Sequence, residues 1–258
     1  FPMLPLERMP VEKARNVSCL FFDLDGTFIT GRALSSRAFL SLEKIRDYGI
    51  KTIAVTGRPA GWCDLIARWW PVDSVVGENG AFSYSKKEDC IHRMSFHDSE
   101  KHPEYRNRLD LLFQELQSRF PDIKLASDQQ FRLWDLAIDI AEESEVSMET
   151  SLQIVKYCRD KGARAEMSNI HVNIWFGDYN KENMSLRVLE DFGLKKESAV
   201  YVGDSPNDSP MFGYFDLSVG VNSVMKYLDI MQHHPIYVTQ NDGSEGFVEL
   251  VEYIISTK

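Results

Sequence analysis

The chain has 258 residues, 43% of them hydrophobic, and a formal net charge of −10. This length suits one large or two modest globular domains, and no apolar stretch approaches the roughly 20 residues that a membrane-spanning helix needs. The excess of acidic side chains excludes broad nucleic-acid binding, which depends on a basic surface, but it does not exclude a small anionic substrate.

The N-terminal part of the chain alternates between strand and helix patterns. Apolar spacing predicts strands over 18–23, 50–55 and 72–76 and helices over 35–48 and 60–69, with Ser35 as the N-cap of the first helix. Such alternation predicts a parallel sheet covered by helices on both faces, which is a Rossmann-like, doubly wound α/β core.

Residues 84–178 have a different rhythm. They predict helices over 104–119 and 147–161, a strand over 133–140, and a hairpin of strands 163–167 and 170–176 around Ser168 and Asn169. This pattern indicates an α+β insert. It divides the chain into a core of residues 1–83 and 179–258 and an inserted domain of residues 84–178.

The alternation of the core resumes after the insert. The sequence predicts a helix over 181–192, a strand over 198–202, a short helix after Asn207, strands over 215–219 and 236–239, and a closing helix over 244–256. The core is therefore built from both ends of the chain.

Two of the predicted strands end in acidic residues. Asp23 and Asp25 follow one apolar run, and Asp204 and Asp208 follow another. Because ligands bind beyond the carboxyl ends of parallel strands, we expect these carboxylates to meet in one crevice. Carboxylates that close repel one another unless a hard cation holds them, and oxygen ligands suit Mg²⁺. A carboxylate nucleophile with a second carboxylate as acid and base is the equipment for phosphoryl transfer through an aspartyl phosphate.

Four segments in order resemble the motifs of the haloacid dehalogenase superfamily of phosphohydrolases. Asp23–Thr27 resembles the first motif, Val55–Pro59 the second, Lys181 the third and Gly203–Asp208 the fourth. The resemblance implies that Asp23 is the nucleophile and a Mg²⁺ ligand. It implies that Asp25 is the general acid and base and gives the metal its backbone carbonyl, and that Asp204 is the second carboxylate ligand.

The resemblance leaves Asp208 three roles: to orient metal-bound water, to orient Lys181, or to ligate the metal directly. Lys181 is implied to neutralise the nucleophile and the transferring phosphate. The residues implied to bind the phosphoryl group or the substrate are Thr56, Gly57, Arg58 and Asn207. For Arg58, two other roles stay open, which are to cap a helix or to pair with Glu78.

The insert resembles the type C2B cap of type IIB members, which include Cof-like and sucrose-phosphate-phosphatase-like enzymes. The turn Asn79–Ala81 before it fits that branch. The polar residues expected to contact substrate are Asp128, Arg132, Asn169, His171 and Asn173. Strict strand alternation puts His171 and Asn173 on one face, where they suit the hydroxyls of a sugar.

These features predict Mg²⁺-dependent hydrolysis of a small phosphomonoester, with a sugar phosphate as the expected class. The alternatives are a phosphosugar mutase and a non-catalytic sensor of the same fold. We expect a small phosphorylated metabolite as partner, and neither nucleic acid nor membrane; the pattern sets no oligomeric state. Cys19, Cys63, Cys90 and Cys158 lack metal-type spacing, which favours free thiols and a cytoplasmic location.

Overall fold

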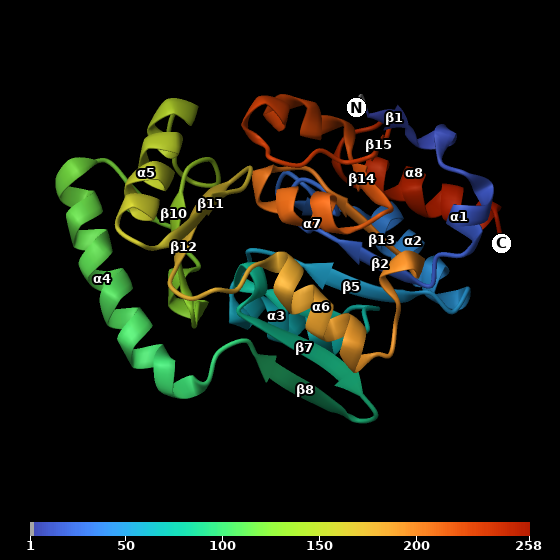
Figure 1. Cartoon of the computed structure of the whole chain (residues 1–258), viewed down its shortest axis with the longest axis horizontal. Helices are drawn as coiled ribbons and strands as arrows, with labels where there is room; N and C mark the ends of the chain where they lie inside the picture. Colours follow the sequence, from blue (N-terminus) through green and yellow to red (C-terminus); the bar gives the residue numbers. More distant parts are fainter. Residues whose placement is uncertain (1–2) are drawn as a thin grey trace.

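The computed structural model describes residues 3–258 (Figure 1). Its largest feature is a nine-stranded mixed sheet in the order β1-β15-β14-β13-β2-β5-β6-β7-β8. The strands from β1 to β6 in this order are parallel, and β7 and β8 close the other edge as an antiparallel hairpin. Their bounds are β1 Leu4–Pro5, β2 Cys19–Phe22, β5 Lys51–Val55, β6 Ser74–Gly77, β7 Phe82–Lys87, β8 Cys90–Ser95, β13 Ala199–Gly203, β14 Ser218–Gly220 and β15 Tyr237–Val238.

Helices cover both faces of this sheet. The helices are α1 Val11–Arg15, α2 Ser36–Asp47, α3 Ala60–Trp69, α6 Lys181–Asp191, α7 Ser209–Tyr214 and α8 Gly243–Ser256. Leu20 and Phe22 of β2 pack with α2, α3 and α8, whereas Cys19 and Phe21 pack with α6 and α7. Successive side chains of one strand thus enter two different apolar layers, which confirms the doubly wound α/β prediction.

Local sequence signals explain where helix α2 begins and which face it buries. The Ser35 hydroxyl accepts a hydrogen bond from the Ala38 N–H at 3.3 Å, as an N-cap should. Ala38, Leu42 and Ile45 are buried against the sheet. The prediction of a strand over 215–219 starts too early, because Phe215 is the C-cap of α7 and its ring packs against Phe21, and β14 begins only at Ser218.

The core sheet continues past residue 84, the predicted start of the insert. That position lies inside β7, and the hairpin carries the sheet on to Ser95. The residues of β8 are exposed or half-buried, as expected for an edge strand, so its sequence carries no core-strand pattern. We refer to residues 96–178 as the cap.

The cap contains a four-stranded antiparallel sheet in the order β11-β12-β10-β9. Its elements are α4 His102–Arg119, β9 Lys124–Leu125, β10 Asp135–Asp139, α5 Met148–Asp160, β11 Arg164–Met167 and β12 His171–Trp175. The two helices lie on the side of this sheet that faces away from the core (Figure 1), where they bury Val172 and Ile174. The inserted α+β unit that the sequence predicts is therefore present.

Two further findings concern the chain as a whole. None of the helices within residues 3–258 combines the length and the apolar character needed to cross a membrane. The four cysteines are free, and Cys90 is the exposed one.

Candidate active site

The two acidic segments meet because the strands that carry them are neighbours. Phe22 at the end of β2 is paired with Val202 of β13, so Asp23 and Asp204 leave the sheet side by side. Oxygen atoms of Asp23, Asp204 and Asp208 all lie within 4.8 Å of one another, and all three residues are buried. Together with Lys181 they form what we call the acidic cluster.

Gly26 makes this close approach possible. Its φ is +87°, and a Cβ atom there would lie 2.2 Å from Oδ2 of Asp204. Only glycine combines that backbone conformation with that lack of bulk. The next residue, Thr27, donates from its hydroxyl to Oδ1 of Asp204 at 3.4 Å, so the turn after β2 also orients the carboxylate of the neighbouring loop.

Lys181 enters the cluster from the first turn of α6. The Asn180 side chain caps this helix by accepting a hydrogen bond from the Asn183 N–H at 2.7 Å. Lys181 is 1% exposed, and its Nζ donates to Oδ1 of Asp23 and to Oδ1 of Asp208, both at 2.6 Å. One ammonium group therefore bridges two of the three carboxylates.

Asp208 already has a full set of hydrogen-bond donors. Besides Lys181, its Oδ1 accepts from the Tyr201 hydroxyl at 2.5 Å. Its Oδ2 accepts from the backbone N–H groups of Asp204 at 2.9 Å and Ser205 at 3.1 Å. This carboxylate fixes the loop after β13 and the position of the lysine.

The acidic cluster carries more negative than positive charge. Burial, followed by the neighbouring Asp208, raises the pKa of Asp23 to about 8 even though Lys181 lowers it. Burial and the carboxylates of Asp23 and Asp208 raise the pKa of Asp204 well above its ordinary range. For Lys181 burial acts to lower the pKa, but Asp208 and Asp23 outweigh it and raise the value. Buried oxygen ligands with an uncompensated charge fit a hard divalent cation such as Mg²⁺.

Arg58 is the centre of a second cluster, which joins the core to the cap. Its Nε and Nη2 donate to the two carboxylate oxygens of Asp25, both at 2.8 Å. The same guanidinium donates to Glu142 at 2.8 and 3.2 Å and to Asp128 at 3.2 Å. Arg132 donates to Asp128 from the other side at 3.1 Å. We call these five residues the Arg58 cluster.

The alternative that Arg58 pairs with Glu78 is wrong. Glu78 is fully buried, and its carboxylate accepts four backbone N–H groups, those of Ala60, Leu133, Trp134 and Asp135. Its charge is thus satisfied by the start of α3 and by the segment that leads into β10. Glu78 fastens the core to the cap and leaves Arg58 to other carboxylates.

The other residues of the second and fourth motifs lie around the same crevice. The Thr56 hydroxyl accepts from the Arg58 N–H at 3.0 Å, and the Gly57 carbonyl accepts from Arg132 at 2.9 Å. The Asn207 amide donates to the side chain of Asn79 at 3.4 Å. Gly57 and Asn207 line the cavity over Asp23, whereas Thr56 is buried beneath it.

The cap closes this cavity almost completely. The walls are Asp23, Asp25, Gly57, Arg58, Ser168, Ile170, His171, Asn173 and Asn207, and the volume is about 10 Å³, room for about one water molecule. His171 and Asn173 face it together, as the predicted strand alternation requires. Asn169 donates to the Asp25 carbonyl at 3.1 Å. A ligand larger than a water molecule can therefore enter only when the cap moves away from the core.

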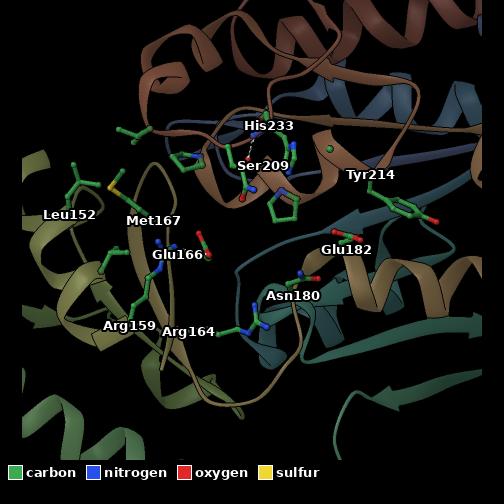
Figure 2. A pocket seen from close by; sticks show the side chains of 16 residues that line it. Leu152, Arg159, Arg164, Glu166, Met167, Asn180, Glu182, Ser209, Tyr214 and His233 are labelled. Atoms are coloured by element: carbon green, nitrogen blue, oxygen red, sulfur yellow. Dashed lines mark hydrogen bonds and ion pairs between the residues drawn. The ribbon is translucent and has the colours of Figure 1, made fainter. Parts of the chain in front are cut away.

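A larger cavity of about 600 Å³ lies beside this crevice (Figure 2). Arg159, Arg164 and Glu166 project into it from the cap, and Asn180 and Glu182 lie across from them on the core (Figure 2). None of the residues of the acidic cluster or the Arg58 cluster lines it. Cavity size is therefore a poor guide to the reactive centre here.

Two residues that bond within or to these clusters, Tyr201 and Glu142, were not among the predicted site residues. Tyr201 lies within a buried apolar strand, and its hydroxyl is the one polar side-chain group of that strand that could have indicated a role. Glu142 stands in the loop after β10 among Glu143 and Glu145, and nothing in that acidic run distinguishes it. Glu142 is distinguished from its neighbours only by the packing of the cap on the core, which brings it into contact with Arg58.

Comparisons with known proteins agree with this geometry. The family model of haloacid dehalogenase-like hydrolases matches residues 20–105 and 102–248. The chain is 21% identical over 243 residues to phosphoglycolate phosphatase 1 of Saccharolobus solfataricus, covering 93% of this chain and 96% of that relative.

Solved structures show the same fold. The sucrose-phosphatase of Synechocystis, solved with sucrose and phosphate, has a TM-score of 0.66 and 16% identity, covering 93% of this chain and 98% of that chain. A subclass IIB sugar phosphatase has a TM-score of 0.62 and 14% identity, covering 94% and 100%. Because the family model spans the core and the cap, the chain belongs to the haloacid dehalogenase-like hydrolases, a family of enzymes, with the fold of subclass IIB.

Proposed function

We propose that this protein is a Mg²⁺-dependent phosphatase of small phosphomonoesters that works through an aspartyl phosphate. The observation that carries the proposal is the acidic cluster. It places Asp23 beside Asp204 at adjacent strand ends, with Lys181 bonded to Asp23 at 2.6 Å. A buried carboxylate with a bound ammonium and an unbalanced neighbour is equipped to attack phosphorus once a cation is present.

The residues that would hold Mg²⁺ are Asp23 and Asp204 through their carboxylates and Asp25 through its backbone carbonyl. Asp208 is the less suitable ligand, because four donors already occupy its oxygens. We therefore assign Asp208 the role of orienting Lys181. When bound, the cation supplies charge neutralisation for the phosphoryl oxygens.

The chain's own residues account for both half-reactions. Asp23 attacks phosphorus in line, the ester P–O bond breaks, and Asp25 gives its proton to the leaving alcohol. Asp25 then takes a proton from the water that attacks the aspartyl phosphate, which releases inorganic phosphate and restores Asp23. We assign Lys181, Thr56, Gly57 and Asn207 the role of holding the phosphoryl group during both steps.

The cap side of the crevice favours a neutral polyol, such as a sugar, as the leaving group. The arginines beside this wall, Arg58 of the core and Arg132 of the cap, are already paired with carboxylates of Asp25, Asp128, Asp135 and Glu142. A leaving group with its own carboxylate would meet this acidic wall without a free cation. His171 and Asn173 offer hydrogen-bonding groups that suit hydroxyls.

The test is phosphate release from a panel of sugar phosphates, polyol phosphates, nucleotides and phosphoglycolate, with Mg²⁺ and with chelator. We expect turnover only with Mg²⁺, and faster turnover of a sugar or polyol phosphate than of phosphoglycolate. Preference for phosphoglycolate would contradict the assignment of the leaving group. Dependence on a bisphosphate activator would favour a mutase, and bound Mg²⁺ without turnover of any compound would favour a sensor.

A further inference from the structure

Arg58 binds Asp25, the proposed acid and base, in an arrangement in which Asp25 cannot reach the leaving group. Arg58 is 9% exposed, and its Nε and Nη2 occupy both carboxylate oxygens of Asp25 at 2.8 Å. During leaving-group departure, one of those oxygens must lie within hydrogen-bond distance of the ester oxygen. Asp25 therefore has to part from Arg58 before it can act.

A bidentate arginine–carboxylate pair does not separate easily in a closed site. Such pairs are short, strong and geometrically fixed, so a guanidinium bound to Asp25 alone would follow that carboxylate. In this structure the guanidinium has three further bonds, all to the cap. They run to Glu142 at 2.8 and 3.2 Å and to Asp128 at 3.2 Å. These bonds can keep Arg58 in place when Asp25 leaves it.

Glu142 is itself held firmly. Its backbone N–H donates to Oδ1 of Asp139 at 2.8 Å, and the next N–H along the chain donates to Oδ2 at 2.9 Å. Asp139 is buried at the end of β10, so the loop that carries Glu142 is tied to the cap sheet. Arg32, in the turn between β3 (Ile29–Thr30) and β4 (Ala33–Leu34) of the core, donates to the Glu142 carbonyl.

We propose that Glu142 is a positioning residue that holds the Arg58 guanidinium against the cap, so that the Asp25 carboxylate can turn to the leaving oxygen. The inference rests on the proposed function, because it assigns Asp25 the role of acid and base. It goes beyond that function by giving a cap residue outside every motif a part in one chemical step.

The test uses two substrates that need the acid to different degrees. The nitrophenolate leaving group of p-nitrophenyl phosphate departs without a proton, whereas the alkoxide of a sugar phosphate needs one. The comparison is of kcat/KM for p-nitrophenyl phosphate and for the best sugar phosphate of the panel, because kcat/KM excludes hydrolysis of the aspartyl phosphate. Nε2 of His171 also lies 2.9 Å from Glu142, so the Arg58→Ala background described below separates a loss through Arg58 from a loss through His171. The variant is Glu142→Gln. The matched control is Glu143→Gln, since Glu143 lies in the same loop but binds Ser127 at 3.0 Å.

We expect Glu142→Gln to lower kcat/KM for the sugar phosphate by at least roughly tenfold, since a positioned acid contributes ~10²–10⁴. The value for p-nitrophenyl phosphate should change by less than about threefold, and Glu143→Gln should change neither. Equal losses on both substrates, or no loss on either, would overturn the proposal.

A second variant pair keeps the test independent of folding. In an Arg58→Ala background, the addition of Glu142→Gln should have no further effect on the sugar phosphate, because Glu142 acts through Arg58. Additive losses would show that Glu142 acts on its own. Failure of the proposed function would appear differently, as absence of Mg²⁺-dependent turnover in the unaltered protein.

Discussion

The acidic cluster and the Arg58 cluster both gather buried charges, but they balance them differently. The acidic cluster contains three carboxylates and one lysine, and the pKa of Asp23 rises to about 8. In the Arg58 cluster the carboxylates are paired with arginines, and contact with His171 and Arg58 lowers the pKa of Glu142 to about 2. The first arrangement leaves negative charge that a proton or a bound cation can balance, and the second joins the cap to the core.

The largest effect should come from Asp23, the proposed nucleophile. Asp23→Asn keeps the size of the side chain but removes the attacking carboxylate, so phosphate release should fall by at least about 10⁴-fold. Steady-state assays at saturating Mg²⁺ measure this. The control is Asp216→Asn, whose side chain is 62% exposed and which should keep full activity. Activity within tenfold of the unaltered protein would place the chemistry elsewhere.

The next effect tests the cation inside the acidic cluster. Lys181→Met removes the ammonium that bridges Asp23 and Asp208, and kcat should fall by roughly 10²–10³, as when one stabilising donor is removed from a reactive centre. The matched control is Lys196→Met, because Lys196 lies away from the acidic cluster, where it pairs with Asp216 at 3.5 Å and lies over the Tyr214 ring. Similar kcat values for both variants would contradict the role of Lys181.

The charge imbalance of the acidic cluster should appear as a pH dependence. With a folded pKa of about 8 against an ordinary 3.8, metal-free Asp23 binds a proton that the unfolded chain releases. The free energy of unfolding without Mg²⁺ should therefore fall as pH rises from about 4 to about 8.

Mg²⁺ must displace that proton, so its affinity should increase up to roughly tenfold per pH unit below pH 8. Titration calorimetry at several pH values measures the affinity, and thermal melts with chelator measure the stability. An affinity that does not change between pH 6 and 8 would contradict the raised pKa of Asp23.

The smallest effect concerns the joint between core and cap. Glu78→Gln replaces a carboxylate that accepts four backbone N–H groups by an amide whose NH₂ cannot accept them. Burial and the nearby Asp135 raise the pKa of Glu78 to about 7. We expect a loss of about 1–3 kcal/mol in the free energy of unfolding, measured in urea. An unchanged midpoint would mean that this joint does not contribute to stability.

The same two clusters show what a sequence can reveal. Asp23, Asp204 and Asp208 could be predicted to meet because they follow buried strands, and strand order alone brings such ends together. The N-cap at Ser35 and the shared face of His171 and Asn173 are likewise local or periodic signals. The partners of Arg58 give no such signal in the sequence, because they depend on how the cap lies on the core. The edge strand β8 was not predicted for a related reason. It is part of the sheet through its pairing with β7, while its own residues are exposed or half-buried and show no strand pattern.

Detection of the covalent intermediate tests the central claim most directly. In the Asp25→Asn variant, p-nitrophenyl phosphate can still phosphorylate the enzyme, but no base remains to activate water, so the phosphoenzyme should accumulate. Acid quenching followed by borohydride reduction converts an aspartyl phosphate to homoserine, which peptide mass spectrometry locates. We predict homoserine at position 23 and none when Asp23→Asn is added. Nitrophenol release with no modification, or with modification at another residue, would contradict the account.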